Sequence, residues 1–351
     1  MIEIDGSYLE GEGQILRTAC ALSAVTQKPC RVFNIRKGRP KPGLMPQHLL
    51  GIQAISQLCQ GRLEGDSLES EEIKFYPGEI NRSRTSINVK IETAGSITLV
   101  LQTLIPPALF ASQPVKISFT GGATDTFFSP TVDYFQYVFL KILEKMGAKI
   151  EINILRRGYY PEGGAGVEVK IFPTELKSLD LTERGNLKKI LVISGAANAL
   201  KDKKVAERQV AGVREVLGKL KLPIEEKIEY YDTCCPGSQI CLIAEFSAQG
   251  GSASGGENTV IGTDNLEKLG KRAEDVGKEA AMELLREQKS EACLDKYLAD
   301  QILPYLALAN GKSRATVSEI TEHCKTNIWV IEKFIKGDFK IKENLISWRL
   351  F

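Results

Sequence analysis

The 351-residue sequence predicts an α/β fold in which a large domain carries a smaller inserted α/β domain. Amphipathic helical patterns alternate with β-rich segments along the chain. Glycine clusters recur between these segments, as several copies of a sheet-plus-helix unit would require, although the letters contain no clean repeat. Near residue 185 a strand, a lysine-rich turn and a long polar helix follow one another. We therefore expect an inserted domain over 185–275, between large-domain segments 1–184 and 276–351.

The individual elements follow from the spacing of apolar residues. Two helical faces are visible near the amino terminus: Ile15, Leu16, Ala19, Leu22 and Val25, and then Leu49, Ile52, Ile55 and Cys59. Alternating apolar residues predict strands over 31–35, 87–91, 115–119, 149–155, 167–172 and 190–194, and a last one at 339–342. Further helices are expected over 96–111, 131–146, 204–220 and 266–288, with shorter ones near 297–309 and 326–335.

Composition excludes some classes of function. Lys plus Arg number 46 and Asp plus Glu number 44, so the formal charge is only +2. A protein that coats nucleic acid without sequence preference needs a large excess of cations, although one local basic cleft remains compatible with this balance. The chain has two histidines, His48 and His323. Any chemistry that needs an imidazole must use one of them.

The sequence also predicts a cytoplasmic protein without membrane contact. The amino terminus is acidic and lacks the pattern of a signal peptide. The most apolar stretch, 99–111, is interrupted by Gln102 and two prolines and is shorter than the about 20 residues that span a bilayer. The eight cysteines form no Cys-x-x-Cys pair, which is typical of reduced core thiols. We expect neither a structural zinc site nor a disulfide framework.

Two loops near the amino terminus are candidates for anion binding. In the first, glycines precede the helix that contains Arg17, and Glu10 and Glu12 could hold Mg²⁺ beside a phosphate. The alternative is a plain strand-to-helix turn whose acidic residues complement the helix dipole. The second loop, rich in proline and glycine, carries four cations, which could bind an anion or simply be solvated: Arg36, Lys37, Arg39 and Lys41. Gln47 and His48 follow it and could extend a cleft, or His48 could be a surface or capping residue.

Polar or aromatic residues in apolar helical contexts are further candidates. Gln102 must find a partner inside an apolar helix, either a core carbonyl or a ligand such as a purine. Pro130 and Tyr134 lie four residues apart and could clamp a planar base or hold the helix to the core. Tyr297 and Gln301 have the same spacing. Asp300 and Gln301 resemble ordinary surface residues unless a site lies beside them.

His323 lies just before the helix expected near Thr326. At that position a histidine can be a cap, a metal ligand, a general base or a nucleophile, or it can be merely structural. No second histidine is nearby, which disfavours a zinc site. No Gly-x-Ser-x-Gly turn is present, which weakens the hypothesis of a serine hydrolase. Its neighbour Cys324 is expected to point away.

Together these segments resemble the RNA 3′-terminal phosphate cyclase family, nearly end to end. The residues that carry the resemblance are Asp5-Gly6, Glu10-Gly11-x-Gly13-Gln14-Ile-Leu-Arg17, Asn34-Ile-Arg36, Lys41-Pro-Gly-Leu44, Gln47-His48, Ser96-x-Thr-Leu-Val-Leu-Gln102-Thr, Gly121-Gly122, Leu298-Ala-Asp-Gln301 and His323-x-x-Thr-Asn-Ile328. Each motif alone is weak, but their order and spacing are specific. The resemblance implies a large domain of three repeated units, each a four-stranded sheet plus two helices, with a small inserted α/β domain.

The resemblance also implies a ligase-type reaction. Members of the family use ATP and a divalent metal, Mg²⁺ or Mn²⁺, to convert an RNA 3′-phosphate into a 2′,3′-cyclic phosphodiester through a covalent histidine–AMP and an RNA-adenylate. The residue matching the nucleophile is His323. The residues matching the ATP site are Gln102, Pro130, Tyr134, Tyr297, Leu298, Ala299, Asp300 and Gln301. Those matching the RNA and phosphate contacts are Arg17, Arg36, Arg39, Gln47 and His48, and Glu10 matches the metal ligand. The expected partner is RNA with a 3′-phosphate end, and a homodimer is allowed.

Departures from the family pattern affect three places. Glu12 and Leu9 replace glycines of the amino-terminal turn, which leaves open whether Glu10 or Glu12 meets the metal. One proline, Pro130, stands where a pair is common. Glu322 precedes His323, and its carboxylate could raise the proton affinity of the imidazole.

Two other functions are alternatives to the cyclase. The first is a non-catalytic relative that acts as a ribosome-assembly factor, but such relatives lack the nucleophilic histidine. The second is an enolpyruvyl transferase, whose domains use similar sheet-and-helix units but whose motifs are not apparent in this sequence.

Overall fold

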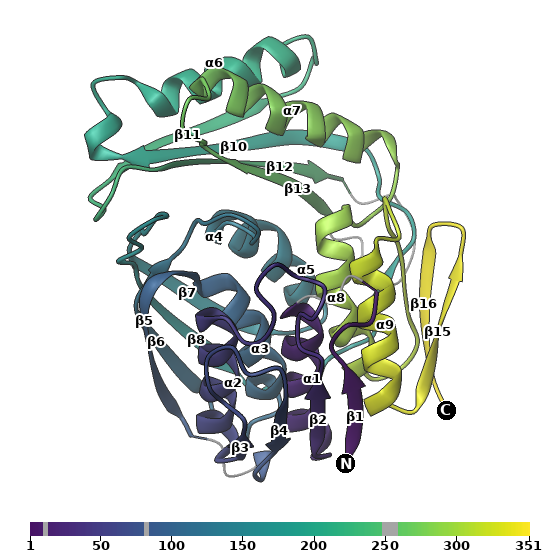
Figure 1. The fold of residues 1–351 in the computed structure, drawn as a ribbon. Helices are drawn as coiled ribbons and strands as arrows, with labels where there is room; N and C mark the ends of the chain where they lie inside the picture. Colours follow the sequence, from purple (N-terminus) through teal and green to yellow (C-terminus); the bar gives the residue numbers. More distant parts are fainter. Residues whose placement is uncertain (10–12, 81–83, 248–258) are drawn as a thin grey trace.

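The computed structural model describes residues 1–9, 13–80, 84–247 and 259–351, which form four four-stranded sheets and the helices packed on them (Figure 1). The mixed α/β class is confirmed. The first sheet and its helices comprise β1 (Ile2–Asp5), α1 (Gly13–Thr26), β2 (Cys30–Phe33), α2 (Pro46–Cys59), β3 (Arg62–Glu64) and β4 (Ile73–Tyr76). The second set comprises β5 (Ser86–Ser96), α3 (Ile97–Leu109), β6 (Val115–Ala123), α4 (Val132–Tyr134), the π-helix η2 (Phe135–Phe139), α5 (Leu140–Lys145), β7 (Lys149–Arg156) and β8 (Gly166–Phe172).

The third set is divided in the sequence. It begins with β9 (Asp180–Leu181) and resumes with α8 (Lys296–Leu308), β14 (Ser313–Thr316), α9 (Glu322–Phe334), β15 (Gly337–Lys342) and β16 (Leu345–Leu350). Between them lie β10 (Leu187–Ala197), η3 (Asn198–Leu200), α6 (Val205–Leu217), β11 (Ile224–Tyr231), β12 (Ser238–Phe246), β13 (Val260–Leu266) and α7 (Ala273–Lys289).

The first three sets share one connectivity. Their sheets have the orders β1-β2-β4-β3, β5-β6-β8-β7 and β9-β14-β16-β15, so the fourth strand always lies between the second and the third. The first two strands of each sheet are parallel and the other pairs are antiparallel. A parallel pair needs a crossover connection, which α1 and α3 supply in the first two sheets and the long segment ending in α8 supplies in the third.

The intervening sheet has a different order, β11-β10-β12-β13. Helices α6 and α7 cover its outer face, while its inner face looks toward α4 and the large domain (Figure 1). Its own apolar core includes Val192, Val213, Leu242 and Leu284. The predicted boundary at residue 275 lies inside α7. The domain limits stay a prediction, and the packing of α7 favours a second boundary beyond Lys289.

Two predicted helix starts are wrong. The helix expected from 266 begins at Ala273, because Leu266 is the last residue of β13, which pairs with β12, and a turn follows it. The helix expected from 326 begins at Glu322, because Thr321 caps it: the Thr321 Oγ1 atom accepts a hydrogen bond from the Cys324 N–H at 3.2 Å. His323 therefore lies within the first turn of α9 and not before it.

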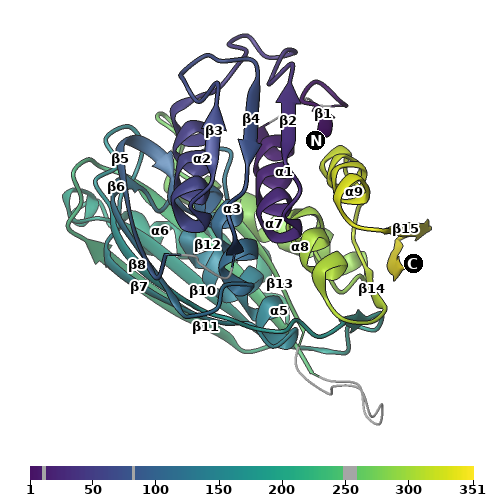
Figure 2. The ribbon, with the colours of Figure 1, turned by 90° about the horizontal axis from the view of Figure 1, so that it is seen from below.

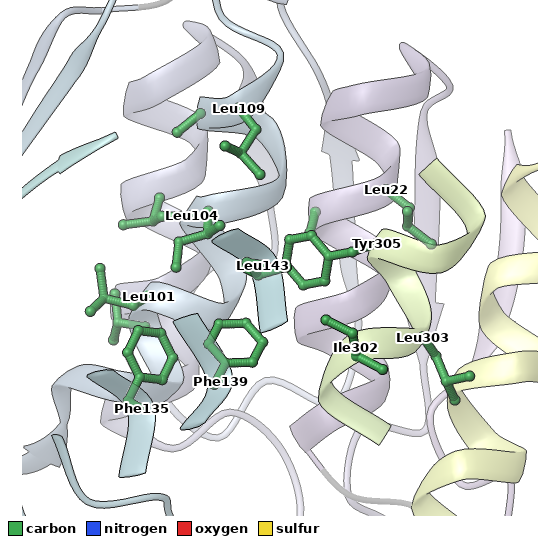
Figure 3. Packing of buried hydrophobic residues seen from close by; sticks show 14 of the residues in the cluster. Leu22, Leu101, Leu104, Leu109, Phe135, Phe139, Leu143, Ile302, Leu303 and Tyr305 are labelled. Atoms are coloured by element: carbon green, nitrogen blue, oxygen red, sulfur yellow. The ribbon is translucent and has the colours of Figure 1, made fainter. Parts of the chain in front are cut away.

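Helix α1 is the centre of the large domain. It packs against α2, α3 and α9, with the sheets on the outside (Figure 2). Small residues that are fully buried, Ala19, Cys20 and Ala24, let these helices approach closely. Around them, Leu22, Leu101, Leu104 and Tyr305 fill the space between α1, α3 and α8 (Figure 3).

The cysteines and the helix lengths bear on the expected thiols and on the apolar stretch noted above. All eight cysteines are described and are free thiols, seven of them buried and Cys234 exposed. Within the described ranges, no helix is both long and apolar enough to cross a bilayer.

A buried polar network joins the inserted sheet to the large domain. The Arg157 guanidinium binds Asp125 at 3.1 Å and Asp133 at 2.5 Å, and all three side chains are almost fully buried. Gln239 of β12 donates from Nε2 to the second oxygen of Asp133 at 3.2 Å. Tyr159 donates its hydroxyl to the Gln239 Oε1 atom. One guanidinium thus neutralises two carboxylates that position the contact between the domains.

We predict that Arg157→Met strongly destabilises the protein. The change leaves two buried carboxylates without their counter-charge, so the free energy of unfolding should fall by about 3–5 kcal/mol. Urea denaturation at pH 7 measures this loss. Arg314→Met is the matched control, because Arg314 forms an exposed pair with Asp180 and should change stability little. Equal, small losses in the two variants would contradict the prediction.

Candidate active site

The carboxyl group of Asp300 lies where three helices from distant parts of the sequence meet. Gln14 of α1 donates from Nε2 to the Asp300 Oδ2 atom at 2.9 Å. The same Oδ2 atom lies 3.9 Å from Nδ1 of His323, in the first turn of α9. The Asp300 side chain is only 16% exposed, so it is not the ordinary surface residue that its sequence context resembled.

Further hydrogen bonds of polar side chains fix the same junction. Asn327 donates from Nδ2 to the Asp300 carbonyl oxygen at 2.8 Å, and Thr18 donates its hydroxyl to Asn327 Oδ1 at 2.7 Å. Gln14 also approaches the His323 carbonyl oxygen, at 3.3 Å. These hydrogen bonds therefore link helices α1, α8 and α9 next to His323.

A cavity of about 430 Å³ opens beside this junction. It is lined by Arg17, Leu99, Gln102, Phe128, Ser129, Pro130, Tyr134, Asp264, Tyr297, Asp300, Gln301 and His323. Asp264 comes from β13, so both the large domain and the inserted sheet contribute to the wall. The His323 side chain is 38% exposed and accessible from this space.

Charge and burial oppose each other at Asp300 and Arg17. Burial raises the pKa of the Asp300 carboxyl group to about 6, although His323 and Arg17 act in the opposite direction. Burial also lowers the pKa of the Arg17 guanidinium to about 10, although Asp300 raises it. Asp300 is thus mostly ionised at pH 7. Its negative charge beside Nδ1 favours the tautomer of His323 that carries its proton there, with the lone pair on Nε2.

Most of the predicted ATP-site residues are together in this cavity. Gln102 donates from Nε2 to Gln301 Oε1 at 2.9 Å, and Gln301 donates to the Tyr297 carbonyl oxygen at 2.6 Å. The partner that the apolar helix context demanded for Gln102 is thus another cavity residue. Leu298 and Ala299 are different: both are fully buried in the core, and their side chains are not part of the described cavity wall.

Tyr134 lines the cavity, and a hydrogen bond to a buried carboxylate holds its side chain in place. It is almost completely buried, and its hydroxyl donates to Asp295 Oδ1 at 2.6 Å. Asp295 caps α8 by accepting from the N–H groups of Tyr297 and Leu298, and its other oxygen accepts from Gly262 N–H of β13 at 3.0 Å. By contrast, the Tyr297 ring is 46% exposed and presents a surface to the cavity.

Of the predicted phosphate contacts, Arg17 lines the cavity, while the rest lie outside its described wall. His48 is buried, and burial together with Arg17 and Arg36 lowers the pKa of its imidazole to about 3. The Met45 N–H donates to His48 Nδ1 at 3.3 Å, so the neutral ring carries its proton on Nε2. That nitrogen would lie 2.1 Å from a Cβ atom at Gly13, which explains why α1 begins with glycine.

The other members of this group occupy the second loop. Arg36 donates to the carbonyl oxygens of Lys41 and Gly43, at 2.7 and 3.1 Å, and so closes its own loop. Arg39 is exposed, and its N–H donates to the Arg36 carbonyl oxygen. Gln47 is half-buried near Gly95.

The expected metal ligand, Glu10, lies outside the described residues, as does Glu12. Among the residues that are described, no cluster of three or more His, Cys, Asp or Glu side chains is suited to a metal ion. Gln14 Oε1 is, however, buried beside Asp300 without a hydrogen-bond partner. It is an oxygen of the type that Mg²⁺ and Mn²⁺ prefer.

Sequence reasoning missed several residues of the site. Gln14 and Asn327 stand inside quoted motifs, and their spacing to Arg17 and His323 could have indicated a shared helical face. Asp264 had no such signal, because the inserted domain shows no pattern that connects β13 with the loop before α4. Phe128 lies two residues before Pro130 and had no such signal either.

Comparisons with known proteins cover the whole site. Residues 8–341 match the family model described as RNA 3′-terminal phosphate cyclase. The chain is 47% identical over 343 residues to an RNA 3′-terminal phosphate cyclase of Pyrococcus furiosus, covering 97% of this chain and 95% of the relative. It is 43% identical to one of Pyrobaculum aerophilum, covering 97% and 95%, and 42% identical to one of Archaeoglobus fulgidus, covering 99% of both chains.

We predict that Asp300→Asn changes how stability depends on pH. The unfolded carboxyl group ionises near its ordinary pKa of 3.8, whereas the folded one remains protonated up to about pH 6. This carboxyl group therefore contributes a loss of about 3 kcal/mol to wild-type stability as pH rises through this window. The amide variant lacks that loss, so its stability relative to wild type should rise with pH. Urea denaturation at pH 4, 5, 6 and 7 measures both proteins. A stability difference that stays constant over this range would contradict the assignment.

Proposed function

Because this chain belongs to the RNA 3′-terminal phosphate cyclase family, we propose that it converts RNA 3′-phosphate ends into 2′,3′-cyclic phosphodiesters through a covalent histidine–AMP. Members of the family are ligase-type enzymes that use ATP and act on RNA. The observation that carries the proposal for this chain is the position of His323. Its imidazole borders the cavity, and its Nδ1 atom faces the buried carboxylate of Asp300.

In the proposed first step, His323 Nε2 attacks the α-phosphorus of ATP and pyrophosphate leaves. The imidazole becomes positively charged as the N–P bond forms, and the Asp300 carboxylate stabilises this charge. Arg17, which borders the same cavity, is placed to offset the negative charge on the phosphates. The product, an N-linked AMP, is labile enough to be passed on.

In the second and third steps the RNA takes over the AMP. An oxygen of the RNA 3′-phosphate attacks the phosphorus of the histidine-bound AMP, and the bond to Nε2 breaks. The neighbouring 2′-hydroxyl then attacks the activated RNA phosphate, loses its proton and displaces AMP. Arg36, Arg39, Gln47 and His48 are the proposed RNA contacts. His48 would serve as a neutral hydrogen-bond donor, because burial and two arginines suppress its charge.

The cavity residues divide between contact and support in this proposal. Tyr297 and Pro130 enclose the adenine, and the amides of Gln102 and Gln301 offer donors and acceptors to its edge. Tyr134 supports them through the Asp295 cap of α8. Leu298 and Ala299 contribute from within the core, where they fix the position of Asp300.

The residues fit a divalent metal in part. Glu10 is the proposed ligand by family match, and Gln14 Oε1 supplies a buried, unpartnered oxygen near Asp300. Bound Mg²⁺ or Mn²⁺ would neutralise phosphate charge during the approach of the nucleophile. The cytoplasmic location and a homodimeric state remain predictions. The alternative of a non-catalytic assembly factor is not favoured, because such relatives lack the nucleophilic histidine. This chain has His323, and that residue borders the cavity.

We predict covalent labelling of the protein by ATP that carries its label on the α-phosphate. In the presence of Mg²⁺ or Mn²⁺, wild type should acquire one acid-labile AMP, and RNA with a 3′-phosphate should discharge it. His323→Ala should retain no label, because the attacking nitrogen is lost. Gel autoradiography after denaturation measures the adduct.

The matched control for this experiment is His48→Ala, the other histidine of the chain. It should still form the adduct if His323 is the nucleophile, whatever it does to the RNA steps. Absence of label in wild type with every metal would overturn the cyclase proposal. Label that persists in His323→Ala would move the nucleophile to another residue.

A further inference from the structure

Phe128 is an aromatic residue at the cavity that the proposed reaction leaves unused. Its side chain is fully exposed, with a relative accessibility of 102%. Its backbone is in the left-handed region, with φ of +62°, which bulky L-residues rarely adopt. Neither feature helps the fold, because the ring buries no surface and a glycine would suit the backbone better.

The loop around Phe128 is nevertheless firmly held. Ser129 donates its hydroxyl to the Thr126 carbonyl oxygen at 2.9 Å, and Thr98 donates to the Pro130 carbonyl oxygen at 2.8 Å. Thr131 N–H donates to Asp264 Oδ2 at 2.7 Å. These bonds fix the residues on both sides, so the ring of Phe128 is presented to solvent by a rigid support.

The preceding residue shows that exposure is not general in this loop. Phe127 packs edge-on against Tyr160, with ring centroids 5.9 Å apart. Phe128 lies on the wall of the 430 Å³ cavity, together with Tyr297 and His323. Two adjacent phenylalanines thus have separate surroundings, and one of them borders the cavity of the nucleophile.

An exposed ring at such a cavity suits a planar, apolar surface that arrives with the ligand. Nucleobases have that shape, and stacking on an aromatic side chain tolerates any base sequence. The unpaired end of an RNA can splay out its last base for such a contact. The adenine of ATP is already enclosed by Pro130 and Tyr297 in the proposed function, which leaves the ring of Phe128 for a second base.

We propose that Phe128 is a stacking platform for the base of the RNA's 3′-terminal nucleotide. The inference rests on the proposed function for the identity of the substrate. The ring would hold the terminal nucleotide at the mouth of the cavity while its 3′-phosphate reaches toward His323. It would act through substrate affinity and would contribute little to formation of the histidine–AMP, which needs no RNA.

The test compares two RNAs and two variants. Phe128→Gly removes the ring in a residue that accepts φ of +62°, so the loop should keep its conformation, and Phe128→Tyr retains the ring. The RNAs are one oligonucleotide with a 3′-phosphate and the same oligonucleotide whose last nucleotide lacks its base. Fluorescence anisotropy gives RNA affinity without turnover, and single-turnover labelling gives the ATP dependence of histidine–AMP formation.

For the intact RNA we expect Phe128→Gly to weaken binding about 5- to 100-fold, and Phe128→Tyr to bind as wild type does. For the RNA without its last base, wild type and Phe128→Gly should bind equally weakly. The ATP dependence of labelling should be the same in all three proteins. Tyr297→Ala is the matched control for the adenine side and should weaken ATP instead.

Other outcomes overturn the inference. If Phe128→Gly needs more ATP than wild type to form the histidine–AMP, the ring contacts adenine instead. If Phe128→Gly loses the same affinity for both RNAs, no terminal base stacks on the ring. Unchanged affinity of Phe128→Gly for the intact RNA would also overturn it. Because anisotropy needs no catalysis, a wild type that binds RNA but forms no cyclic product would refute the proposed function and still test Phe128.

Discussion

Burial of the Asp300 carboxyl group is the constraint on which the rest of the site depends. A buried carboxylate must be hydrogen-bonded and close to positive charge, or it takes up a proton. Gln14 and Arg17 of α1 and His323 of α9 provide this environment around Asp300 of α8. The requirement therefore fixes the relative positions of three helices. It also fixes the orientation of the only histidine that borders the described cavity.

The inserted sheet is part of this arrangement and not an independent appendage. Asp264 of β13 accepts from the loop that carries Phe128 and Pro130, and Gly262 of the same strand donates to Asp295 at the start of α8. Farther along the contact, Asp133 joins Arg157 to Gln239 of β12. The position of the insert therefore shapes one wall of the cavity.

Much of the fold could be predicted from local patterns, whereas the site depended on long-range contacts. Apolar spacing placed the strand that begins at Val115 and the helix around Gln102 nearly correctly. Apolar spacing does not reveal that Thr321 caps α9, and it therefore predicts His323 before the helix instead of within its first turn. The pairing of Gln14 with Asp300 joins residues 286 positions apart, which no local period encodes. Asp300 therefore looked like a surface residue until the resemblance to a family grouped it with His323.

The central claim is that AMP becomes covalently attached to the imidazole of His323, beside Asp300. Peptide mass spectrometry of the protein after incubation with ATP and Mg²⁺ or Mn²⁺, under conditions that preserve N–P bonds, tests it most directly. The account predicts the mass of one AMP on the peptide that contains His323, with fragmentation placing it on the histidine. An adduct on another residue, or none on a protein that still cyclises RNA, would contradict the account.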